Sequence, residues 1–309
     1  MSSFITINIE ICMKFYSYVL IGLILFTSNL KSQPAPDYSV LKCGYSKSLT
    51  VQMKMEEGKA VVEVLIQEII KENSRSEKAE SIIIENSQQL LQEIKNGLDM
   101  TVVLVPEYWE LKKKIKLFPQ VIPVTGDSVQ DRTLLLIKKN SSIKNLNDLA
   151  GKKIVISGEI STEKSIMQIW LHTLIKKQTQ KEVHKFFGSV YKVSTGPTAI
   201  MDLFFNKADA ALVIQSNYLA LQELNPQIGE QLKVFIRSEP FVFAVLLFTE
   251  KLLNHPDKKL IMDKILNMDK TRSGKNYLNL FKLTKMVPYQ EAYLENTFRL
   301  LSEYEKFKK

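Results

Sequence analysis

Apolar runs of strand length alternate with segments of helical periodicity along most of this 309-residue chain. The apolar run at 38–45 precedes a segment at 56–72 whose apolar side chains recur with helical spacing. A strand-like run at 82–85, a helical segment at 87–97 and a further apolar run at 99–105 follow in the same order. Strands that alternate with helices pair in parallel, with the helices packed on the faces of the sheet. The pattern therefore predicts an α/β fold built on mostly parallel sheets flanked by helices.

The stretch 143–165 repeats this strand–loop–helix order and predicts a ligand site. Residues 152–156 have the β-branched, apolar composition of a buried strand, and a helical pattern runs from Glu163 to Lys177. The first N–H groups of a helix have no acceptor inside the helix, so they suit an anion. Ser161 and Thr162 directly precede this helix and are therefore candidate ligand-binding residues.

A second polar loop follows the strand-like run 189–193. Pro197 suits the first position of a helix, which makes Ser194, Thr195 and Gly196 a second candidate anion site at a helix N-terminus. Each loop taken alone could equally be an ordinary N-cap, because Ser, Thr and Gly are common there. Two such loops in one half of the chain favour a ligand.

Four further candidates follow the first and third predicted strands. Tyr45 and Ser46 end the first strand, and Tyr108 and Trp109 follow the third. Ligands of open α/β sheets bind at the carboxyl ends of the strands, and aromatic side chains with a polar edge suit the wall of a ligand site. The alternative is that these rings pack at the bases of loops.

Two segments of the chain resemble a known family. The run NLNDLAGKKIVIS at 145–157, followed by Ser161 and Thr162, and the run NKADAALV at 206–213 resemble segments of type II periplasmic solute-binding proteins. The closest likeness is to the phosphate, phosphite and phosphonate-binding components of ABC importers. In that family a loop of the type Ser-Thr-Ser-Gly holds the oxyanion. This chain reads STEKS at 161–165, so the first two residues match and the glycine does not.

The resemblance implies two lobes with a mostly parallel sheet in each and two crossing segments as a hinge. We expect lobe 1 to comprise 38–125 and 236–309, and lobe 2 to comprise 126–235. It further implies that a small anion, phosphate-like or phosphonate-like, is captured between the lobes and delivered to an ABC permease in the membrane. No cofactor or metal is expected, nor a nucleic-acid partner, and the protein is expected to be a monomer.

The first 33 residues predict a secretory signal peptide. Met13 and Lys14 precede the apolar run 15–26, which is short for a membrane span, and polar residues follow it. Met13 is a second candidate for the true start of translation. We therefore expect a periplasmic or secreted protein, with an uncleaved membrane anchor as the alternative.

Two other functions stay open at this point. No acid–base pair, metal-ligand spacing or phosphate loop is evident, and the three histidines, His172, His184 and His255, are far apart. An enzyme acting on a small acid with the same fold is nevertheless one alternative. A ligand-sensing or scaffold module for a membrane signalling partner is the other. The net charge of +9 fits an anionic ligand but also an ordinary solvated surface.

Overall fold

The computed structural model describes residues 37–49, 55–71, 74, 76–158 and 165–308. Residues Tyr38–Lys309 form one compact unit, which holds every element named below. Among the helices of these described ranges, none is both long enough and apolar enough to cross a bilayer.

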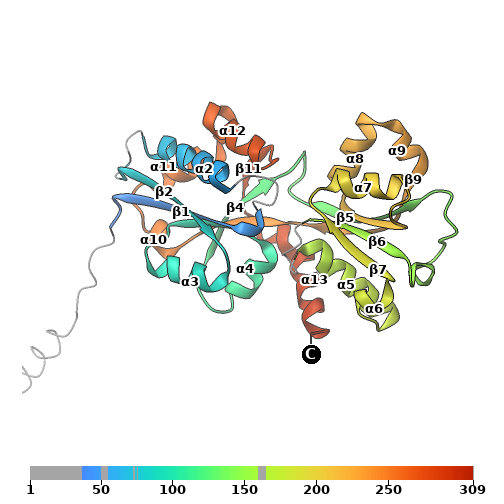
Figure 1. Cartoon of the computed structure of the whole chain (residues 1–309). Coiled ribbons are helices and arrows are strands. Elements are labelled where there is room, and N and C mark those ends of the chain that lie inside the picture. The colour runs from blue at the N-terminus through green and yellow to red at the C-terminus, as the bar shows by residue number, and fades with distance from the viewer. Residues whose placement is uncertain (1–36, 50–54, 72–73, 75, 159–164, 309) are drawn as a thin grey trace, which may run out of the picture. The chain divides into compact units, whose positions relative to one another are not determined.

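The first sheet has six strands in the order β11-β4-β10-β3-β1-β2 (Figure 1). Its strands are β1 (Val40–Ser46), β2 (Lys78–Ile84), β3 (Met100–Leu104), β4 (Phe118–Val124), β10 (Ala244–Phe248) and β11 (Lys285–Pro288). β1 pairs in parallel with β2 and β3, whereas β10 runs antiparallel to both β3 and β4. Strands β1 to β4 therefore all end at the same edge of the sheet.

Helices cover both faces of this sheet because its strands are apolar on both sides. One face packs against α2 (Met55–Ile70), α10 (Glu250–Leu253), α11 (Lys258–Leu266) and α12 (Arg272–Leu280). The other face packs against α3 (Ser87–Lys95) and α4 (Val105–Leu111). Short 3-10 turns complete this part of the chain: η1 (Lys47–Leu49), η3 (Met268–Lys270) and η4 (Glu291–Leu294).

The second sheet has five strands in the order β7-β6-β8-β5-β9. They are β5 (Asp131–Lys138), β6 (Lys153–Ser157), β7 (Ser189–Val193), β8 (Ala210–Ile214) and β9 (Leu232–Phe241), with η2 (Leu146–Leu149) before β6. One face packs against α7 (Gly196–Phe204), α8 (Gln215–Leu224) and α9 (Pro226–Gln231), and the other against α5 (Ile166–Thr179) and α6 (Val183–Phe186).

The α/β fold predicted from the alternation of strands and helices is confirmed, and both sheets are mixed. The parallel pairs are those that the alternation predicts: β1 with β2 and β3, and β6 with β7 and β8. The antiparallel pairs are β5 with β8 and β9, β10 with β3 and β4, and β11 with β4. An apolar run carries no signal for the direction of its neighbour, so the sequence could not distinguish these strands.

The C-terminal helix α13 (Glu295–Lys306) packs against one helix from each sheet, α4 after β3 and α5 after β6. The helix is regular and packed as far as Lys306. Toward α4, Glu305 accepts a hydrogen bond from Trp109 Nε1 (2.8 Å) and pairs with Lys113. Toward α5, Glu303 pairs with Lys177 (2.6 Å). The helix therefore ties α4 to α5.

Cys43 lies in the core of the first sheet with 7% of its surface exposed. Burial, with a smaller contribution from the charge of Asp99, raises the pKa of its thiol to about 12. Cys43 therefore packs as a small buried hydrophobic residue.

A buried ion pair joins β3 to the helix that follows β10. The side chain of Asp99 is 0% exposed, and its Oδ2 lies 3.1 Å from Lys251 Nζ. The same oxygen accepts a hydrogen bond from the backbone N–H of Lys42 (2.8 Å). Burial raises the pKa of the Asp99 carboxyl, against the opposing effects of the Lys42 N–H and the Lys251 ammonium.

Replacing Lys251 by Met should destabilise the protein strongly, since it leaves the Asp99 carboxylate buried without its cation. The expected loss is about 3–5 kcal/mol in the free energy of unfolding, measured by urea denaturation. Lys259→Met, on the exposed face of α11, is the control and should change stability by less than about 0.5 kcal/mol. Equal effects of the two substitutions would contradict the importance of this pair.

Candidate ligand-binding site

The carboxyl ends of β6, β7 and β8 lie side by side at one edge of the second sheet. Gly158, which follows β6, donates its N–H to Val193 O at the end of β7 (2.9 Å). Ser216, which follows β8, donates its N–H to Asp131 Oδ2 at the start of β5 (3.3 Å). The loops after three parallel strands are thus brought together at one edge, where ligands of open α/β sheets bind.

Thr195 is the N-cap of α7 at this edge. Its backbone is extended, with φ −131° and ψ 152°, and its Oγ1 accepts the N–H of Thr198 (3.2 Å). The two hydroxyl oxygens of Thr195 and Thr198 are 2.7 Å apart. The N-cap interpretation of this loop is therefore present in the structure, and one of the two hydroxyl protons is available for sharing with a further acceptor.

Gly196 lies against the start of α8. A Cβ added to this glycine would come within 2.4 Å of Asn217 Nδ2 and 2.8 Å of Asn217 Cβ. The amide of Asn217 therefore lies beside the first turn of α7, and a larger residue at 196 would displace it. Ser194 is exposed at the same loop. Sequence reasoning missed Asn217, although the polar run of residues 215–217 directly after a strand is a signal of the same kind as the predicted loops.

The edge of the first sheet carries Tyr45 and Ser46, but both side chains are buried. Tyr45 is 2% exposed, and its ring is edge-on to that of Phe281 with centroids 6.4 Å apart. Ser46 is 4% exposed, and its Oγ donates to Glu107 Oε1 (2.8 Å). Tyr45 thus lies in the core at the base of its loop.

Tyr108 and Trp109 lie on α4 and pack toward α13. The rings of Tyr108 and Trp109 have centroids 6.2 Å and 5.0 Å from that of Phe298. Burial raises the pKa of Tyr108 to about 12, with smaller effects from Tyr289 and Glu291. The ammonium of Lys112 lies 4.2 Å from the ring centre of Trp109. Both rings therefore pack at the base of a loop. This is the alternative to a ligand-site wall that the sequence analysis gave for these two residues.

Glu107 organises the polar groups at this edge. Its Oε1 accepts hydrogen bonds from Ser46 Oγ (2.8 Å) and Ser48 Oγ (3.2 Å), and its Oε2 accepts the N–H of Leu104 (3.0 Å). The carboxylate therefore joins the loop after β1 to the start of α4. Sequence reasoning missed Glu107. An acidic residue in the first turn of a helix, directly after a strand and a proline, is the signal that could have identified it.

Ser161 and Thr162, the remaining predicted site residues, lie outside the described residues. Two arginines lie on the strands next to the crossings between the sheets. Arg132 lies beside Asp131 at the carboxyl edge of the second sheet and donates from Nη1 to Ser238 O (2.6 Å), which links β5 to β9. Arg237 is exposed on β9.

Ser76, His255 and Asp257 form a Ser–His–Asp cluster near the start of β2. Its hydrogen bonds do not leave the histidine able to accept a proton from the serine. Asp257 N donates to His255 Nδ1 (2.9 Å), so in the neutral ring the proton is on Nε2. Nε2 lies 3.3 Å from Ser76 Oγ, whose hydroxyl donates to Tyr38 O (2.8 Å). A general base acting on Ser76 needs a lone pair on that nitrogen. The cluster therefore fixes a buried turn and does not activate a nucleophile.

His172 packs against α13 and hydrogen-bonds to the segment after α5. Its Nε2 lies 2.9 Å from Glu182 Oε2, and its ring is edge-on to Tyr304. Within the described ranges no group of three or more His, Cys, Asp and Glu side chains is arranged to hold a metal ion.

Each sheet is buried on both faces, and short crossings at 125–130 and 242–243 join the two sheets. Polar loops lie at the carboxyl edges of both. This arrangement is that of a two-lobed substrate-binding protein. The chain belongs to the family of periplasmic substrate-binding proteins of phosphonate ABC transporters, whose model matches residues 59–294. The resemblance stated from the sequence is thereby confirmed. No curated protein sequence matches the chain.

Solved structures of this kind share the fold at low sequence identity. A Xanthomonas citri protein bound to ATP has a TM-score of 0.63 and 13% identity, over 87% of this chain and 98% of that one. PhnD1 from Prochlorococcus marinus in complex with methylphosphonate has a TM-score of 0.59 and 16% identity, over 87% and 100%. A binding protein component of an ABC phosphonate transporter from Pseudomonas aeruginosa has a TM-score of 0.58 and 14% identity, over 88% of each chain.

Removing the Glu107 carboxylate should loosen the edge of the first sheet. Glu107→Ala leaves three donors without their acceptor and should lower the free energy of unfolding by about 2–3 kcal/mol in urea denaturation. Glu107→Gln keeps one acceptor oxygen and should lose roughly half as much. Glu110→Ala, on the same helix, is the control. A Glu107→Ala protein as stable as this control would show that the three hydrogen bonds contribute little.

Proposed function

We propose that this chain captures a small anion of the phosphate or phosphonate class between its two lobes and delivers it to an ABC permease. The observation that carries the proposal is the meeting of the α7 and α8 starts at the carboxyl edge of the second sheet, with Gly196 against Asn217. Membership of a phosphonate-transporter family supports the same ligand class. The sequence predicts lobes of residues 38–125 with 236–309, and 126–235. Because β9 stays in the second sheet to Phe241, the lobes we propose are 38–125 with 242–309, and 126–241.

The groups at this edge would meet the charge of an anion with hydrogen bonds. Pro197 has no N–H, and Thr198 gives its N–H to the cap, so the first turn of α7 offers the N–H of Gly196. The hydroxyls of Thr195 and Thr198 and the amide of Asn217 are the side-chain donors beside it. Hydroxyl, amide and backbone donors of this kind bind tetrahedral oxyanions without a full counter-charge.

The predicted residues enter the proposal with different roles. Ser194, Thr195 and Gly196 are proposed to contact the ligand, and Ser161 and Thr162 remain candidates from the sequence. Ser46, Tyr45, Tyr108 and Trp109 are proposed to support the opposite lobe, since their side chains are engaged in the contacts described above.

Thr195→Asp separates ligand binding from helix capping. Asp caps a helix as well as Thr does and interacts favourably with the helix dipole, so the free protein should unfold at an unchanged or higher temperature. Its negative charge should reduce affinity for methylphosphonate and phosphate at least about 100-fold in isothermal titration calorimetry, because like charges within contact distance repel strongly.

Thr195→Asn is the matched control, since it caps the helix without a charge. It should weaken binding by about tenfold or less through loss of the hydroxyl. If Thr195→Asp binds the anion as tightly as Thr195→Asn, the ligand does not lie at the start of α7. A protein that binds neither anion would contradict the proposed ligand class.

The proposal includes export to the periplasm or secretion, with residues 1–33 as a cleavable signal peptide, and action as a monomer without a cofactor. Cleavage should produce a mature chain that begins near Gln33, measured as intact mass after expression in a secreting bacterium. A membrane-bound product that keeps the apolar run 15–26 would show that the segment is an anchor.

A further inference from the structure

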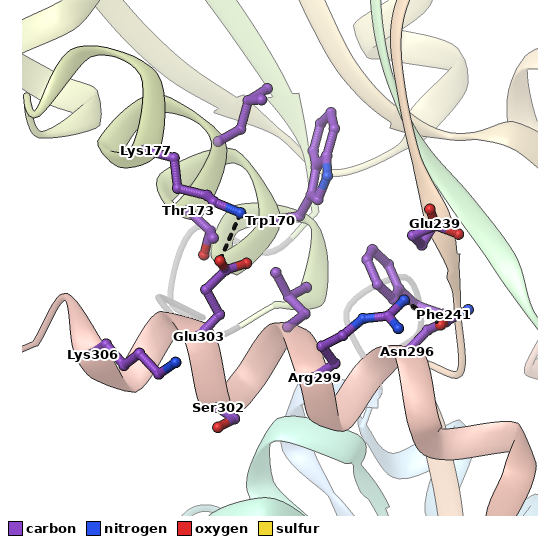
Figure 2. Close-up of a pocket in the computed structure, with 12 residues that line it drawn as sticks. Trp170, Thr173, Lys177, Glu239, Phe241, Asn296, Arg299, Ser302, Glu303 and Lys306 are labelled. Carbon is purple, nitrogen blue, oxygen red and sulfur yellow. Dashed lines mark hydrogen bonds and ion pairs between the residues drawn. The ribbon is translucent and has the colours of Figure 1, made fainter.

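A groove of about 460 Å³ lies between α5, the end of β9 and α13, and its lining residues include none from the loops that start α7 and α8 (Figure 2). Side chains of two helices form its walls. Trp170, Leu174 and Lys177 come from α5, while Arg299, Leu300 and Glu303 come from α13. Phe241 closes the groove from β9.

The floor of the groove is apolar and aromatic. Trp170 is 8% exposed, Phe241 3% and Leu300 7%, so each side chain is anchored in the core and reaches the groove with one edge. Thr173 also lines the groove, but its hydroxyl donates to Ile169 O (2.8 Å) and adds no available donor there. The floor therefore suits a flat or aliphatic apolar body.

The rim carries cations that have no carboxylate partner in the described part of the chain. Lys177 and Glu303 neutralise each other across the groove (2.6 Å), as the dashed line in Figure 2 shows. Among the described residues, Arg299 donates one hydrogen bond, to Asn296 Oδ1 (2.7 Å), which leaves most of its fork of donors available. No described carboxylate lies within 4.0 Å of Arg299 or Lys306.

The counter-charge at the rim is smaller than this cationic charge. Glu239 of β9 is the acidic side chain of the lining outside the Lys177–Glu303 pair, and it is exposed to solvent. Two cations against one solvated carboxylate give a net positive rim over an aromatic floor. An anionic group with two acceptor oxygens matches a guanidinium fork.

We infer that this groove is a second binding site, for an amphipathic organic anion with a flat apolar body and one carboxylate, sulfonate or phosphate group. The body lies on Trp170, Phe241 and Leu300, and the anionic group accepts hydrogen bonds from Arg299, with Lys306 nearby. This inference is independent of the proposed function, since none of these residues belongs to the anion site at α7.

The position of the groove gives its occupant a physical consequence. It contacts α5 and β9 of the second sheet together with α13, and α13 is held to α4 by Glu305, Trp109 and Lys113. An occupant therefore stabilises the packing of α13 on α5 and hence the connection between the two lobes.

The test uses 8-anilino-1-naphthalenesulfonate as the probe, with the full mature chain and fluorescence titration. We expect one probe per chain. N-phenyl-1-naphthylamine, which has the same apolar body without the sulfonate, should bind at least about tenfold more weakly. Millimolar inorganic sulfate, which lacks the body, should not displace the probe.

Arg299→Gln should weaken probe binding about tenfold, because it removes the charge-assisted hydrogen bonds from the guanidinium to the sulfonate. Ser302→Glu, an exposed position on the same rim, should weaken it similarly by adding a negative charge. Arg272→Gln on α12 removes the same charge elsewhere and should stay within about twofold of the parent. Thermal unfolding of each variant verifies that it is folded.

Four results would overturn the inference. The first three are absence of probe binding, equal binding by the charged and neutral probes, and equal affinities of Arg299→Gln and Arg272→Gln. The fourth is loss of probe binding in Thr195→Asp, which would place the probe at the proposed anion site. Failure of methylphosphonate to bind leaves the groove result unaffected, so the two proposals fail separately.

Discussion

Burial of each sheet on both faces is the constraint on which the rest of the structure depends. In β6, Ile154, Val155 and Ile156 are all buried, although successive side chains point to opposite faces. Helices must therefore cover both sides, and each must begin where a strand has just ended. Most side chains on the faces are apolar, with a few buried hydroxyls such as those of Thr101 and Thr133, and the loops at the carboxyl edges are polar. The candidate anion site at Thr195 and Gly196 is a direct consequence of this arrangement.

The sequence predicted the parts of the fold that depend on local pattern. The strand 189–193 has the predicted bounds, and the helix after Pro197 begins within a residue of its predicted start, because composition and capping chemistry are local. The direction of pairing at β5, β9, β10 and β11 was not predictable, since it depends on which strand lies next to each apolar run. Family resemblance supplied the two-lobed architecture that periodicity alone does not.

The site was predicted less completely than the fold because its geometry is tertiary. Thr195 and Gly196 were identified from their position before a helix, but Asn217 enters only because α8 starts beside α7. Glu107 was missed because its partners, Ser46 and Ser48, lie some sixty positions earlier in the chain. Tyr45 and Tyr108 were candidates for the wall of the site by residue type, and the structure engages both rings in packing. Residue type identifies a candidate, whereas burial decides what its side chain can reach.

The burial of Cys43 makes the chain well suited to site-specific labelling. The thiolate is the form that reacts with maleimides and iodoacetamides, and a pKa of about 12 leaves almost none of it at neutral pH. Cys12, the other cysteine of the chain, lies within the proposed signal segment. A cysteine introduced on the surface of either lobe would therefore be the reactive thiol of the mature protein. Dyes placed in this way would test whether the lobes move on ligand binding, without prior removal of native cysteines.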